Sequence, residues 1–198
     1  MRTHHATPDR MGAFSDGVIA VVITIMVLEL RPPMNGSLSA LAPLWPTAIS
    51  YAVSYLFIAI IWMNHHHLLR FVRQATPTLL WLNFAHLFAV SLLPFATNWM
   101  ADSRLSATPV AAYASLFVVV NLIYLAFERE VLRHADARRF PAAAQRSARR
   151  RSIITVSTFA AAAALAALAP WLGFALICAA LLLYVSPEAP SRMLTLVR

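Results

Sequence analysis

The residues of this sequence that could do chemistry are polar side chains set inside long apolar runs. Asp16 lies eight residues after Pro8 in the run 8–30, and a carboxylate at such a position is costly unless it has partners. Counting inward from the ends of three runs brings five more polar residues to a similar depth: Ser15, Asn64, His65, Asn83 and His86. Because unsatisfied polar groups are costly in hydrocarbon, we expect these side chains to form a hydrogen-bonded cluster that joins the three runs.

Two kinds of chemistry fit this cluster. Asp16 and a histidine could relay protons or bind an ion, whereas hydrogen bonds alone would make the cluster structural, and the structural interpretation is favoured. The run His65-His66-His67 does not predict a metal site, because successive residues of a helix point about 100° apart. The sequence has no nucleophile motif and no phosphate-binding glycine loop, so it predicts neither an enzyme nor a bound cofactor.

The run 8–30 also carries two apolar stripes at helical spacing. Val21, Ile25 and Leu28 are spaced i, i+4 and i+7, with Thr24 beside them. Val18, Val22, Met26 and Glu29 form a second stripe on another face of the same helix. Such stripes are usually packing surfaces, and spacing alone does not say which of the two packs against the rest of the protein.

Composition sets the environment of these residues. The chain of 198 residues is 60% hydrophobic and 12% charged, with a mean hydropathy of +0.67, which is typical of an integral membrane protein. Six runs approach the ~20 residues that a spanning helix needs. The predicted fold is therefore an all-α membrane domain over residues 1–198, with its last two helices divided at Pro170. The expected helices are 8–30, 44–67, 78–99, 108–128, 152–169 and 171–186, with an arginine-rich cytoplasmic segment at 129–151.

The net charge is +8, and all of the basic residues are arginines. The positions of these arginines favour a role in membrane topology over nucleic acid binding. With the amino terminus inside, only Arg31 and Arg104 fall outside, and the other 14 of the 16 arginines are cytoplasmic. This distribution follows the positive-inside rule. It predicts that the chain is a multi-pass protein of the plasma membrane with both termini in the cytoplasm. The segment 129–151 is expected to be a helix or a loop that lies against anionic lipid headgroups. The single cysteine, Cys178, excludes an internal disulfide, and the first run is expected to stay as an anchor because it lacks a cleavage site.

Three motifs carry a resemblance to a known family. Arg10 to Asp16 reads RMGAFSD and fits the pattern RxxxFSD, 62–66 reads WMNHH, and the third run joins Trp81-Leu82-Asn83 to Leu93-Pro94-Phe95. All three motifs lie in the first half of the chain, within or at the ends of its apolar runs. This half resembles the bacterial members of the transmembrane protein 175 family of potassium channels. The second half is similar mainly in hydropathy.

The resemblance implies a function and an assembly. It implies six spans per chain and four copies around one axis, with the first helix of each copy lining a pore for K⁺. The pore would have an apolar constriction at Val21, Ile25 and Leu28, a polar position at Thr24, and no TVGYG filter. Arg10, Phe14, Ser15 and Asp16 would form the family's structural motif. The expected function is a modestly selective potassium channel with no cofactor; the alternatives are a proton-coupled transporter that uses Asp16 and a histidine, and a membrane scaffold without flux.

Overall fold

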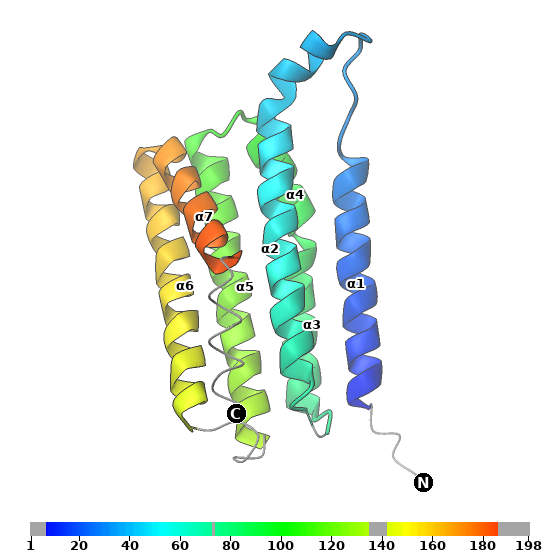
Figure 1. Ribbon diagram of the computed structural model, residues 1–198, viewed down its shortest axis with the longest axis vertical. Helices are drawn as coiled ribbons and strands as arrows, with labels where there is room; N and C mark the ends of the chain where they lie inside the picture. The colour runs from blue at the N-terminus through cyan, green and yellow to red at the C-terminus, as the bar shows by residue number, and fades with distance from the viewer. Residues whose placement is uncertain (1–6, 73, 135–141, 186–198) are drawn as a thin grey trace.

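The computed structural model describes residues 7–72, 74–134 and 142–185, which fold into a bundle of helices without a β-strand in these ranges (Figure 1). The prediction of an all-α protein is confirmed. The elements, in chain order, are α1 (Pro8–Leu28), the 3₁₀ helix η1 (Leu38–Leu44), α2 (Trp45–Leu69), α3 (Pro77–Ser91), α4 (Leu93–Asp102), α5 (Ala107–His134), α6 (Ala142–Leu168) and α7 (Pro170–Val185).

The start of α1 follows from its first residues. The side chain of Thr7 accepts a hydrogen bond from the backbone N–H of Arg10 at 3.4 Å, and Pro8 occupies the first turn, where its missing N–H has no cost. The helix ends at Leu28, and Pro32 and Pro33, which follow shortly after, could not continue it. At about 1.5 Å per residue, its 21 residues are long enough to cross a bilayer.

The third run bends at the position that its proline predicts. The helix breaks at Leu92 into α3 and α4, and Pro94 lies in the first turn of α4. A proline has no N–H to donate and its ring displaces the carbonyl four residues earlier, so the continuous helix is interrupted there. The hydroxyl of Thr97 donates to the carbonyl of Leu93 at 2.7 Å, within the first turns of α4.

Helices α5 and α6 both extend into the arginine-rich segment. The sequence predicted that the fourth span ends at 128 and that 129–151 forms a separate cytoplasmic segment, but α5 continues to His134 and α6 begins at Ala142. Val131 explains the longer α5, because it is buried in a second apolar cluster with Met11, Leu79 and Phe127. Residues 135–141 lie outside the described part of the chain.

Pro170 divides the last apolar run, as predicted, and α7 turns back along α6 (Figure 1). The two helices approach closely because small residues meet: a Cβ placed on Gly173 would lie 2.6 Å from the Cβ of Ala166. Five segments of the described chain are long and apolar enough to cross a membrane. The sixth apolar helix, α7, has only 16 residues, or about 24 Å of rise, which is less than the ~30 Å hydrocarbon core.

The bundle places α1 at one edge and α6 at the opposite edge, with α2 to α5 between them (Figure 1). An aromatic contact holds its centre, where the ring of Phe57 stacks on that of Phe117 at 3.5 Å and meets the edge of Phe159 at 5.8 Å. The arginines are unequally distributed between the two ends of the bundle. In the described ranges, Arg31 and Arg104 lie at the end where α1 stops and α5 begins, and the other eight lie at the opposite end: Arg10, Arg70, Arg129, Arg133, Arg146, Arg149, Arg150 and Arg151.

Candidate functional site: the uncovered face of α1 and the polar cluster beside it

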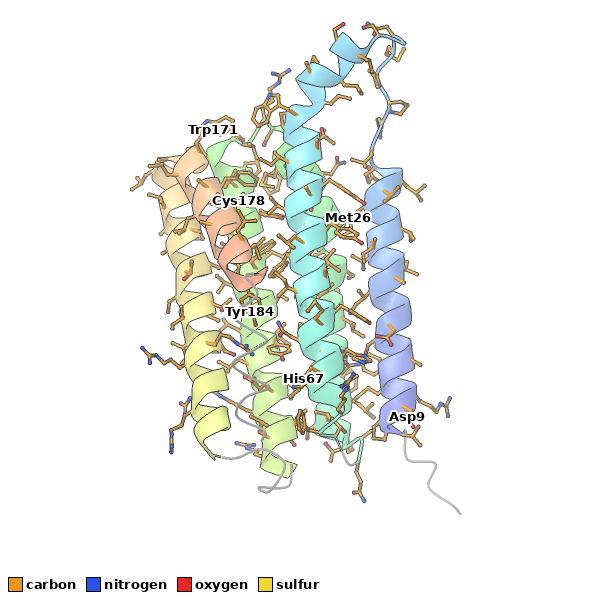
Figure 2. The ribbon with its side chains drawn as sticks, in the orientation of Figure 1. Asp9, Met26, His67, Trp171, Cys178 and Tyr184 are labelled. Atoms are coloured by element: carbon orange, nitrogen blue, oxygen red, sulfur yellow. The ribbon has the colours of Figure 1, made fainter. Side chains whose placement is uncertain are left out.

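The two apolar stripes of α1 have opposite surroundings. Val22 and Met26 are each 3% exposed and pack in the core, where Figure 2 shows Met26 between α1 and α2. Val21, Ile25 and Leu28 are 54%, 42% and 81% exposed. In a single chain, therefore, one stripe packs against the bundle, and the stripe Val21–Ile25–Leu28 is left uncovered.

Thr24 lies on the same uncovered side of α1. Its hydroxyl donates to the backbone carbonyl of Val21 at 2.8 Å, and its side chain is exposed. Because the hydroxyl proton is used within the helix, the oxygen lone pairs remain free to accept from water or to face a cation. Arg10 and Phe14 are also exposed, and the ring of Phe14 meets the edge of Phe84 on α3 at 5.6 Å between centroids.

A buried hydrogen-bond cluster joins α1, α2 and α3. The hydroxyl of Ser15 lies 3.2 Å from Oδ1 and 3.0 Å from Nδ2 of Asn83, and it also donates to the carbonyl of Met11 at 2.9 Å. Nε2 of His65 lies 2.7 Å from Oδ1 of Asn83, and since a carbonyl oxygen only accepts, His65 is the donor. All three side chains are at most 1% exposed. Asn83 is therefore the residue that holds the other two together.

Asp16 lies outside this cluster, contrary to the sequence prediction. Its Oδ1 accepts a hydrogen bond of 2.8 Å from the indole N–H of Trp62. Asp16 comes directly after Ser15 and so points to a different side of α1, where its carboxylate remains partly exposed. One turn of α2 separates Trp62 from the buried His65, so this bond adds a second, more exposed link between α1 and α2.

The predicted cluster was also wrong for Asn64 and for the hydrogen bonding of His86. Asn64 faces away from α1, and its side chain donates to the hydroxyl of Tyr184 on α7 at 3.1 Å. The ring of His86 lies parallel to that of His65, with 5.8 Å between centroids. Neither nitrogen of His86 makes a hydrogen bond of ordinary geometry with the described residues.

The three consecutive histidines point in different directions. His65 is buried, the ring of His66 stacks on that of Trp62 at 5.3 Å, and the ring of His67 meets the edge of Phe71 at 5.5 Å. Their side chains do not converge on a common point.

Sequence reasoning missed a second polar cluster, in the half of the bundle away from the arginines. The hydroxyl of Ser54 lies 2.7 Å from that of Thr97 and 2.6 Å from that of Tyr113, so it joins α2, α4 and α5. Thr97 follows Pro94 by three residues, and a hydroxyl that close to a helix break was the available signal. Nearby, Asn98 of α4 donates to the carboxylate of Glu29 at 3.2 Å and holds it just beyond the end of α1.

A family model described as the endosomal/lysosomal potassium channel TMEM175 matches residues 10–94, which contain α1 to α3 and the polar cluster. A potassium channel of Chryseobacterium sp. is 40% identical over 127 residues, which cover 64% of this chain and 66% of that protein. A potassium channel of Streptomyces collinus is 34% identical over 125 residues, covering 59% and 61%. The human endosomal/lysosomal proton channel TMEM175 is 31% identical over 130 residues, which cover 60% of this chain and 25% of that protein.

The fold has a solved counterpart. The crystal structure of a lysosomal potassium-selective channel TMEM175 homologue from Chamaesiphon minutus matches with a TM-score of 0.79, covering 89% of this chain and 95% of that one at 24% identity. The likeness of fold thus extends into the second half of the chain, whereas the sequence matches to the two bacterial relatives span less than two thirds of their length.

Proposed function

Because the chain belongs to the TMEM175 family, with residues 10–94 as its matching core, we propose that it forms a potassium-permeable channel. In this proposal, four copies assemble around one axis and the α1 helix of each copy lines the pore. The pore needs no bound cofactor, and the family is one of ion channels, which is not an enzyme class. The relatives named potassium channels support K⁺ as the permeant ion.

One observation carries this proposal: the stripe Val21–Ile25–Leu28 is uncovered, while Val22 and Met26 of the second stripe of α1 are buried. A helix at the edge of a bundle has its outward face covered either by lipid or by other copies. The sequence match to a channel family favours other copies, with this face turned to a central axis.

Repeated around that axis, the three residues form apolar rings. A narrow apolar neck empties of water and raises the barrier to ions. A cation that crosses it gives up part of its hydration shell, which costs less for K⁺ than for the more strongly hydrated Na⁺. Thr24, between the first and last ring, would offer hydroxyl oxygens in place of lost water. Selectivity obtained in this way is modest.

The orientation in this proposal follows the arginines. The end of the bundle that carries eight of the ten described arginines faces the cytoplasm, with both termini on that side of a plasma membrane. Glu29, held by Asn98, then lies on the outer side, beyond the last apolar ring.

A proton-coupled transporter is the alternative, and vertebrate relatives are named proton channels. It requires Asp16 to exchange protons with a histidine. In the described residues the carboxylate of Asp16 bonds to Trp62, and the imidazole of His65 bonds to Asn83. Since Asp16 and His65 share no hydrogen bond, the geometry favours the potassium channel.

The proposal predicts a potassium leak. Purified protein in liposomes with an outward K⁺ gradient is expected to show K⁺ efflux several-fold faster than Na⁺ efflux under a matched gradient, because Na⁺ holds its water more tightly. Chemical crosslinking in detergent is expected to end at four chains. Saturable exchange driven by pH from uncrosslinked monomers would support the transporter instead, and the absence of flux would contradict both.

A further inference from the structure

A cavity of about 620 Å³ lies on the other side of the bundle, lined by α2, α5, α6 and α7 and by His86 of α3. No residue of α1 lines it, so the cavity is separate from the proposed pore. Its volume lies within the range of ~300–1,000 Å³ that small-molecule sites usually have.

The inner part of this cavity is mainly apolar, although Asn64, His86, Asn121 and Tyr124 also line the cavity. Its walls come from Phe57, Ile60 and Ile61 of α2, Val120 of α5 and Leu181 of α7, all of which are at most 9% exposed. The apolar part of the wall gives water few hydrogen-bond partners, and apolar cavities stay dry or take up apolar ligands. The inner part therefore fits a hydrocarbon chain.

The end of the cavity nearest the arginine-rich side is different. Arg150 and Arg151 of α6 line it, and the guanidinium of Arg151 lies 5.6 Å from the ring centroid of Tyr184, at the far end of α7 (Figure 2). Ser152 and Thr155 add hydroxyl groups. The cavity thus passes from an apolar interior to a mouth with two guanidinium groups.

These two arginines are available to an anion. Among the described residues, no carboxylate lies within ion-pair distance of either guanidinium. The nearest acid in this region, Glu128, accepts from the hydroxyl of Ser152 at 3.2 Å but lines a separate depression between α5 and α6. With two positive charges against one negative, the mouth of the cavity keeps a net positive charge. Guanidinium groups suit phosphate because their planar N–H groups can contact two oxygens together.

The depth of the mouth matches that of lipid headgroups. The apolar segment of α6 that is long enough to cross a membrane begins at Arg149, so Arg150 and Arg151 stand at its boundary. Basic side chains at this level bind anionic headgroups, whereas the wall residues Ile60 and Phe57 lie at the level of acyl chains.

We propose that this cavity is a binding site for one anionic phospholipid per chain, with the phosphate at Arg150 and Arg151 and an acyl chain against the α2 and α5 walls. The change from apolar wall to paired guanidinium groups is the pattern that such an amphiphile complements. Residues 186–198, which follow α7 and lie outside the described ranges, are the alternative occupant.

Native mass spectrometry of the detergent-purified protein tests this proposal. Phosphatidylglycerol, phosphatidylcholine with the same acyl chains, and glycerol 3-phosphate are each titrated, and the fraction of chains with one bound ligand is measured. We expect one phosphatidylglycerol per chain, about tenfold weaker binding of phosphatidylcholine, and no retained glycerol 3-phosphate.

Two variants and their matched controls assign the site. The double change Arg150→Glu/Arg151→Glu is expected to weaken phosphatidylglycerol binding at least about tenfold, whereas Arg149→Glu, on the side of α6 that faces the separate depression, leaves it unchanged. Ala180→Phe is expected to fill the cavity and lower the binding of both lipids, whereas Ala161→Phe on the exposed side of α6 is not.

Two results would overturn the proposal. One is phosphatidylglycerol binding unchanged in the double arginine variant, which decides the question even if Ala180→Phe fails to fold. The other is tenfold or greater tightening when the chain is ended after Val185, which would make residues 186–198 the natural occupant. Neither result depends on potassium flux, so the proposed lipid site and the proposed channel are tested independently.

Discussion

Replacing Ile25 or Leu28 with asparagine is expected to raise potassium flux through the reconstituted protein by about tenfold or more. Both side chains lie on the uncovered stripe of α1, and four copies of either would make one ring of the proposed constriction. An amide ring gives water hydrogen-bond partners, so the neck stays wet and the barrier to the ion falls; a tenfold change in rate needs only about 1.4 kcal/mol. The measurement is K⁺ efflux from liposomes, normalised to the amount of folded protein.

The control for this prediction is Leu122→Asn. Leu122 is 48% exposed, close to the 42% of Ile25, but it lies on α5 and not on α1. The flux of this variant should equal that of the wild type. Unchanged flux in both α1 variants, or an equal rise in Leu122→Asn, would mean that the stripe does not line the conduction path.

Asn83→Ala is expected to lower the free energy of unfolding by about 2–3 kcal/mol and to reduce the yield of assembled protein. The amide of Asn83 holds Ser15 of α1 and His65 of α2. Its loss leaves the imidazole Nε2–H buried without a partner and opens a small cavity. Ser15 keeps its bond to the carbonyl of Met11, so the loss falls mainly on His65. Unfolding midpoints in a denaturing detergent series, together with the fraction of crosslinked tetramer, measure the effect.

Two matched changes locate the effect at Asn83. Asn98→Ala removes an exposed hydrogen bond to Glu29, and Asp16→Ala removes the partly exposed bond to Trp62. Each should cost about 1 kcal/mol or less. A loss as large in Asp16→Ala as in Asn83→Ala would return the carboxylate to the central role that the sequence alone suggested.

Much of the fold can be predicted from the sequence, because the length and apolar content of a run predict a membrane helix and prolines predict where it begins or ends. Pro170 predicted the division of the last run, and Thr7 with Pro8 and Pro94 explain the start of α1 and the break before α4. The end of α5 was not predicted because the residues after Glu128 are rich in arginine and fit either a helix or a loop; the packing of Val131 in the second apolar cluster explains the longer helix.

The polar cluster was only partly predictable, for a geometric reason. Counting residues gives the depth of a side chain but not the direction in which it points. Ser15 and Asp16 share a depth, as do Asn64 and His65, yet neighbours along a helix face different partners. The cavity could not be predicted either, because it depends on how far the short α7 covers α2 and α5.

Thiol accessibility at Ile25 tests the pore most directly. The chain has one cysteine, Cys178, so Cys178→Ala gives a background in which Ile25→Cys is the sole thiol. A membrane-impermeant, positively charged thiol reagent should label this cysteine from the aqueous side and stop most of the K⁺ flux, because four fixed cations would then occupy the neck. Flux that stays unchanged after complete labelling, or a cysteine that the reagent never reaches while K⁺ still flows, would contradict a pore lined by α1.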